Sequence, residues 1–172
     1  VTHMRARLNL DGGPVRQDEP AIVTRFGRYN GAPMQLDFIK MREAGINAAF
    51  FAVDVTGAKG THMQYAVDGL GFFLREAALS AEDIVIARCA ADITRAREED
   101  KLAAVLAIEN TDALDQSIYP LSAFHELGVR ALTVTHSTRS WAADGCEVEN
   151  GGGLTWFGKR MIEEMNSLGM LV

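Results

Sequence analysis

Two residues that can bind metals or move protons follow apolar stretches in this sequence. Glu109 follows the seven apolar residues 102–108, and His136 follows the segment 131–135. Each stretch predicts a buried strand. In α/β enzymes, a strand holds an ionisable residue at its carboxyl end while the loop beyond it opens to substrate. Glu109 and His136 are therefore the first candidates for a functional site.

Each of the two residues has a functional and a structural interpretation. A buried carboxylate at Glu109 is costly unless a cation or hydrogen-bond donors meet it. It could bind a metal at the top of the sheet, or cap a neighbouring helix, or pair with an arginine. His136 could bind metal, stabilise a developing oxyanion as a donor, or be a structural histidine at the edge of the core. If their strands are parallel neighbours, both project from one sheet edge, which favours a joint functional site.

Other residues near these strands carry weaker signals. Asp54 ends the apolar run Ala48–Val53 and could face the same site or be a turn residue. Trp141 and Asp144 follow His136 in the next loop and could line a pocket. His125 lies in the last turn of an expected helix, where a cation interacts favourably with the helix dipole, so we expect a structural role.

A cassette of helix, glycine and strand occurs three times along the chain. A glycine just past a helix end accepts the left-handed backbone that terminates the helix. Such short links favour a parallel sheet with helices packed outside it. The three cassettes comprise helices 36–44, 114–127 and 154–168, glycines 45, 128 and 169, and strands 46–55, 129–136 and 170–172.

The remaining elements complete an α/β array. We expect a helix over 61–79, a strand over 84–87 and a short helix over 92–99, with Asp112 and Thr155 as helix N-caps. The segment up to Pro33 carries glycine and proline and predicts irregular structure.

The element count predicts part of a barrel. The 172 residues hold about three strands and the start of another, whereas a closed (β/α)8 barrel takes about 250 residues. We therefore expect an α/β fold that is about half of a (β/α)8 TIM barrel. Residues 1–172 would form one incomplete domain, cut at both ends, because the sequence stops inside the apolar stretch 170–172.

The net charge and the length of the apolar runs limit the classes of partner that we expect for this chain. The net charge of −6 with no basic block argues against a nucleic-acid partner, since phosphate binding needs clustered lysine and arginine. The apolar runs are shorter than the roughly 20 residues of a membrane span, and no signal peptide is visible.

Cys89 and Cys146 are too few for a disulfide framework. We expect reduced thiols in a cytoplasmic protein, with a single disulfide between them left open.

Several spaced stretches, in order, resemble the membrane (renal-type) dipeptidases, the M19 metallopeptidases. The resemblance covers nearly the whole chain from about Gln35 onward. It is most specific from Leu102 to Trp141, where several elements agree in order and separation. The matching stretches are 44–51, 107–109, 114–115, 124–130, 132–137, 141–142, 153–154, 157–158, 164–166 and 168–172.

This resemblance implies a function. The family is a (β/α)8 TIM barrel of the metal-dependent hydrolase (amidohydrolase) type with two zinc ions, and the resemblance implies that this chain is about the first half of such a barrel. The family hydrolyses dipeptides, including some with a D-residue on the C-terminal side. Glu109 stands at the position of the family's carboxylate that bridges both zinc ions. His136 stands at the position of a histidine that contacts the substrate or the tetrahedral intermediate.

The sequence also departs from the family pattern. The His-x-Asp motif of the family's first strand is absent, and Thr2-His3-Met4 does not replace it. The two later zinc-binding histidines, and the arginine and aspartate that contact substrate, lie beyond Val172. Glu109 is then the one metal ligand of the expected set, whereas a catalytic zinc takes about three protein ligands. We therefore expect this chain alone not to retain zinc and to be inactive.

Three functional hypotheses follow. The first is a zinc-dependent dipeptidase of which this chain is a fragment. The second is a non-catalytic half-barrel scaffold or binding protein, which would cover its open sheet edge by forming a homodimer. The third is a related amidohydrolase that acts on lactones or acylated amino acids. The sequence alone does not fix the exact substrate, the metal or the oligomeric state.

Overall fold

The computed structural model describes residues 38–56, 58 and 61–172. The irregular opening segment expected up to Pro33, with His3 in it, lies outside the described residues. The first two residues of the helix expected at 36–44 also lie outside them.

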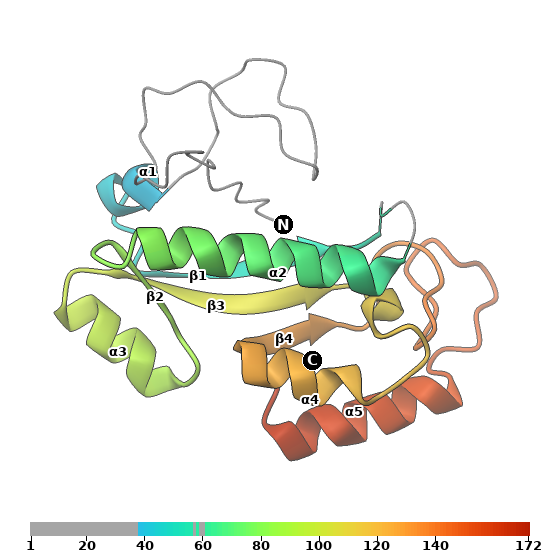
Figure 1. Ribbon diagram of the computed structural model, residues 1–172. Helices are drawn as coiled ribbons and strands as arrows, with labels where there is room; N and C mark the ends of the chain where they lie inside the picture. Colours follow the sequence, from blue (N-terminus) through green and yellow to red (C-terminus); the bar gives the residue numbers. More distant parts are fainter. Residues whose placement is uncertain (1–37, 57, 59–60) are drawn as a thin grey trace.

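Four parallel strands form one sheet in the part of the chain that the structure describes (Figure 1). Their bounds are Ala48–Asp54 for β1, Ile84–Ile86 for β2, Leu102–Glu109 for β3 and Val129–Thr133 for β4. β3 is central, because β1 pairs along its length while β2 pairs with its first part and β4 with its second. Asp54 and Thr133 both lie opposite Glu109. The carboxyl ends of three strands therefore meet at one edge of the sheet.

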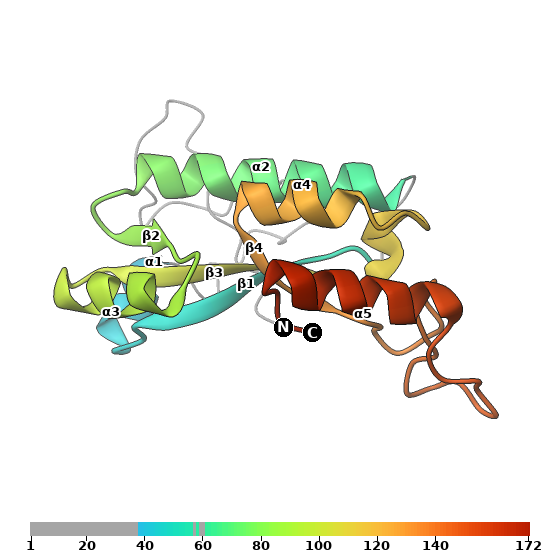
Figure 2. The same cartoon turned by 90° about the horizontal axis from the view of Figure 1, so that it is seen from below.

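Helices cover the sheet. α2 packs on β1 and β2, α3 on β2 and β3, and α4 on β4 and α5, an arrangement visible in Figures 1 and 2. The helices comprise α1 Phe38–Glu43, α2 His62–Leu79, α3 Ala90–Glu98, the 3-10 helix η1 Thr111–Leu114, α4 Pro120–Leu127 and α5 Trp156–Leu168. Among the described helices, none is both long and apolar enough to cross a membrane.

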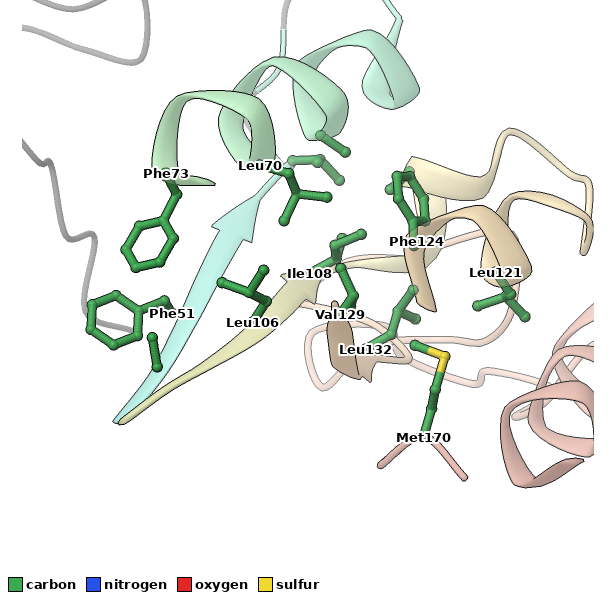
Figure 3. Packing of buried hydrophobic residues seen from close by; sticks show 14 of the residues in the cluster. Phe51, Leu70, Phe73, Leu106, Ile108, Leu121, Phe124, Val129, Leu132 and Met170 are labelled. Atoms are coloured by element: carbon green, nitrogen blue, oxygen red, sulfur yellow. The ribbon is translucent and has the colours of Figure 1, made fainter. Parts of the chain in front are cut away.

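The two faces of β3 bury different clusters. Leu106 and Ile108 join the main hydrophobic core with side chains from α2 and α4 (Figure 3). Met161 and Met165 of α5 belong to the same core. Ala103 and Val105 point to the other face, because side chains alternate along a strand, and they join a smaller cluster that includes Ala96 of α3. By the same alternation Glu109 lies on this second face, away from the main core.

The third cassette continues the sheet beyond β4. Leu171 forms a parallel bridge with Ala131. The Leu171 amide donates to the Arg130 carbonyl at 2.8 Å, and the Leu132 amide donates to the Leu171 carbonyl at 3.1 Å. β4 thus lies between β3 and the chain at Leu171.

Most predicted elements are present, but three predictions were wrong. The helix expected over 114–127 is interrupted, because Asp115 and Gln116 adopt positive φ values of 49° and 64°. α4 begins only at Pro120, whose fixed φ suits a first helical turn. Asp112 caps nothing there, and its amide instead donates to the Asn110 side chain. The strand expected over 129–136 ends at Thr133.

The helix ends follow the predicted chemistry. The three cassette glycines, 45, 128 and 169, have φ values of 73°, 108° and 69°. Thr155 caps α5 as expected, since its hydroxyl accepts a hydrogen bond from the Gly158 amide at 3.0 Å.

Candidate active site

Glu109 lies at the carboxyl end of β3 and is 6% exposed. Every residue of β3 is buried, so the packing of the strand fixes the position of the carboxylate at its carboxyl end. The Glu109 carbonyl accepts a hydrogen bond from the Val55 amide at 3.2 Å, which ties it to the chain just past β1. The sheet thus fixes Glu109 from both neighbouring strands.

His136 reaches Glu109 from a loop rather than from a strand end. β4 ends three residues before His136, so the strand-end position predicted from sequence is wrong. The loop nevertheless brings Nε2 of His136 to 3.3 Å from Oε1 of Glu109. Nδ1 of His136 lies 2.8 Å from the Ser137 hydroxyl. The two candidates are therefore adjacent, as expected from neighbouring parallel strands.

The pair places a buried carboxylate against a partly exposed imidazole. The His136 side chain is 42% exposed and the Glu109 side chain 8%. Carboxylate oxygen and imidazole nitrogen are the donor atoms that zinc accepts, so the chemistry of the pair suits a metal. The number of donors does not complete a site: no group of three His, Cys, Asp or Glu side chains within the described residues is placed to hold a metal ion.

Asp54 and Trp141 contribute to turns beside the pair. A carboxylate oxygen of Asp54 accepts a hydrogen bond from the Thr56 amide at 2.8 Å, which is the turn contact that the sequence allowed. Trp141 is 47% exposed, and its amide donates to the Asp112 carboxylate at 3.1 Å.

Asp144 organises the loop that follows His136. Its carboxylate accepts hydrogen bonds from the amides of Gly152 and Gly153 at 2.6 and 3.1 Å, and it pairs with the guanidinium of Arg139. The hydrogen bond from Arg139 is the main cause that holds the pKa of Asp144 below its usual value. Asp144 thus holds this loop together, and its role in lining a pocket stays a prediction.

Two buried hydroxyls near the pair were missed by sequence reasoning. Thr111 is 0% exposed and Ser140 is 7% exposed. Both hydroxyls lie within hydrogen-bonding distance of the Val134 carbonyl, at 2.9 and 3.0 Å. Threonine and serine carry no charge and sit in no periodic pattern here, so only the tertiary structure shows their convergence.

The chain is similar to known dipeptidases. A family model described as "Membrane dipeptidase (Peptidase family M19)" matches residues 15–172. Dipeptidase 3 of Mus musculus is 41% identical over 78 residues, which cover 42% of this chain and 16% of that protein. Dipeptidase 3 of Homo sapiens is 28% identical over 166 residues, which cover 92% of this chain and 33% of that protein.

A solved structure, an amidohydrolase from Pseudomonas aeruginosa, superposes with a TM-score of 0.71 at 28% identity. The match covers 77% of this chain and 39% of that chain. This chain therefore spans well under half the length of the relatives that it matches.

The same comparisons contradict the predicted cytoplasmic location. The matching family is described as membrane dipeptidases, and Dipeptidase 3 is among its relatives. The prediction rested on Cys89 and Cys146, which are free thiols in the structure and do not form a disulfide with each other. Two unpaired cysteines do not identify a compartment, because a protein in an oxidising compartment can also lack disulfides.

Proposed function

Because the chain belongs to the membrane dipeptidase family, peptidase family M19, we propose that the complete natural protein is a zinc-dependent dipeptidase. The observation that carries the proposal is the 3.3 Å approach of His136 to Glu109 at the carboxyl edge of the parallel sheet. In barrel enzymes the reacting groups come from this edge. We further propose that residues 1–172 form about the first half of one (β/α)8 barrel, in line with the 39% of the P. aeruginosa chain that they cover.

Glu109 is the residue that would hold metal. Its buried carboxylate has two oxygens, which suits a ligand that bridges two zinc ions. When bound, such a pair of ions supplies an activated water and polarises the carbonyl that is cleaved. Zinc binding needs about three protein ligands per ion, so the remaining ligands would come from residues outside the described part. We propose that these ligands lie outside residues 1–172 and that this chain alone is therefore inactive.

His136 is the residue that would contact substrate. If the Ser137 hydroxyl donates to Nδ1, the neutral imidazole carries its proton on Nε2, the nitrogen that faces Glu109. That N–H can donate to the oxygen on which negative charge develops during hydrolysis. Its partial exposure leaves room for a small molecule to approach from the loop side.

The test is hydrolysis of a dipeptide panel by the complete natural protein before and after removal of metal by a chelator. We expect hydrolysis to disappear with the metal and to return when zinc is restored. Hydrolysis that persists at full rate in metal-free protein contradicts the proposal.

A variant of the imidazole tests its assigned role. His136→Ala should lower kcat by about 100-fold to 1,000-fold, the usual cost of a lost oxyanion donor, with metal content unchanged. His125→Ala, in the last turn of α4, serves as the control. Loss of both metals from His136→Ala would instead identify His136 as a ligand.

A second candidate function is hydrolysis of acylated amino acids or lactones. It is favoured by the likeness to a protein described as an amidohydrolase, and Glu109 and His136 could serve either reaction. Comparing kcat/KM for dipeptides with kcat/KM for N-acyl amino acids and lactones distinguishes the two.

The scaffold alternative requires a homodimer over the sheet edge. Size-exclusion chromatography of the complete protein measures whether such a dimer forms.

A further inference from the structure

We propose that Thr111 and Ser140 form a buried hydroxyl latch that positions His136 against Glu109, an inference that rests on the proposed function for its catalytic consequence. The latch consists of these two side chains and the carbonyl of Val134. Neither residue touches the reacting groups, so both are positioning residues.

The need for a latch follows from where the sheet ends. The pairing between β3 and β4 stops at Glu109 and Thr133. Beyond these residues no ladder hydrogen bonds join the segment after β3 to the segment after β4. The distance between Glu109 and His136 nevertheless depends on how far apart these two segments lie. A loop without such bonds is more mobile than the strand that it follows. The position of His136 would then vary relative to Glu109, which the sheet fixes.

The hydroxyls replace the missing ladder. Thr111 lies two residues after Glu109, and Val134 lies two residues before His136. The Thr111 hydroxyl is 2.9 Å from the Val134 carbonyl and 3.0 Å from the Ser140 hydroxyl, which is itself 3.0 Å from that carbonyl. The three groups form a closed triangle that joins the two segments just beyond the carboxyl ends of β3 and β4.

The surrounding contacts hold Ser140 in place. Its hydroxyl oxygen accepts hydrogen bonds from the amides of Ala142 and Ala143 at 3.1 and 3.2 Å. A second link runs from the Trp141 amide to the Asp112 carboxylate at 3.1 Å. The segment from 134 to 143 is therefore fastened to the segment from 110 to 112 at more than one point.

The burial of the Thr111 and Ser140 hydroxyls makes the loss of either contact costly. Both hydroxyls are almost fully shielded from water, so a lost partner is not replaced by solvent. A substitution that removes the Thr111 hydroxyl without changing its branched shape should therefore let the Val134 carbonyl and the following His136 shift.

Thr111→Val in the complete natural protein is the main test, with Thr111→Ser as the conservative variant. Thr94→Val is the matched control, because Thr94 is exposed on α3. We measure kcat, KM and zinc content for dipeptide hydrolysis, each in the wild-type and the His136→Ala background. A displacement of about 1 Å at a catalytic group can cost about 100-fold in rate, so we expect kcat to fall by roughly 10-fold to 100-fold.

The expected pattern separates positioning from general stability. Thr111→Val should lower kcat with little change in KM or zinc content, Thr111→Ser should restore kcat, and Thr94→Val should match wild type. In the His136→Ala background Thr111→Val should have no further effect. An unchanged kcat in Thr111→Val, or an equal loss in both backgrounds, overturns the proposal. If Thr111→Val does not fold, Ser140→Ala takes the same measurements with the same outcomes.

A spectroscopic arm keeps the latch testable if the proposed function fails. If the wild-type protein hydrolyses no dipeptide, the proposed function is refuted. The position of His136 is then followed by its ring signal alone. The ring signal of His136 in histidine-labelled protein, assigned by its loss in His136→Ala, should shift in Thr111→Val and not in Thr94→Val. An unchanged ring signal in Thr111→Val overturns the latch whatever the catalytic result.

Discussion

Glu76 should make the stability of this protein fall as the pH rises from acidic to neutral values. The side chain is 0% exposed on the inner side of α2. Neither carboxylate oxygen has a hydrogen-bond partner among the residues that the structure describes. Burial raises the pKa of Glu76 from 4.5 to about 7, and the charge of Arg75 opposes the rise.

The sign follows from proton binding in the two states. Below about pH 4.5 the carboxyl is protonated in both the folded and the unfolded chain. Between that pH and about 7 the unfolded chain releases the proton while the folded chain keeps it, so the free energy of unfolding falls as pH rises. Above about pH 7 the carboxyl is ionised in both states and the loss stays constant.

The size of the loss follows from the pKa difference. At about 1.36 kcal/mol per pKa unit, the rise from 4.5 to about 7 corresponds to about 3 kcal/mol. About 2.5 kcal/mol of this should appear between pH 5 and pH 8.

The assay compares Glu76→Gln with wild type by urea unfolding at pH 5 and pH 8. Glutamine keeps the shape of the protonated acid and carries no charge, so any packing cost of the amide cancels between the two pH values. The variant should gain about 2.5 kcal/mol relative to wild type on going from pH 5 to pH 8. Glu82→Gln, at an exposed position, should show no such gain. A stability difference between Glu76→Gln and wild type that is equal at both pH values would refute the reasoning.

Two further substitutions test how α5 is fastened to the loop before it. In Gly158→Ala the new Cβ would lie 2.1 Å from the Ala142 carbonyl oxygen, so the free energy of unfolding should fall by about 1–3 kcal/mol; an unchanged thermal midpoint would contradict this contact. Thr155→Ala should cost about 1 kcal/mol because it removes the N-cap hydroxyl, whereas Thr155→Ser should keep the cap; equal stability of the two variants would argue against the cap.

The elements that sequence predicted are those set by local signals. The buried run of β3 and the glycines that end the cassette helices carry their signal within a few residues, and both are present. The proximity of Glu109 to His136 followed from the parallel arrangement of the two segments. These parts of the fold need no knowledge of distant contacts.

The failures arise where tertiary structure overrides local pattern. Asp115 and Gln116 adopt left-handed backbone without being glycine, so they gave no sequence signal of the break. Pro120, which begins α4, was the signal that the prediction of a helix over 114–127 overlooked. β4 ends at Thr133 and not at His136, because Val134 turns its carbonyl to two hydroxyls instead of to a neighbouring strand. Glu76 is a charged residue type that is buried on α2, and its environment is visible only in the folded chain.

The role of Glu109 as a metal ligand is the central claim, and the zinc content of Glu109→Gln tests it most directly. The complete natural protein and the variant are purified alike, and bound zinc per chain is measured together with dipeptide hydrolysis, with Glu98→Gln at the exposed end of α3 as the control. We predict that Glu109→Gln loses bound zinc and at least about 100-fold of its hydrolysis, while Glu98→Gln matches wild type. Wild-type zinc content and full hydrolysis in Glu109→Gln would contradict the account.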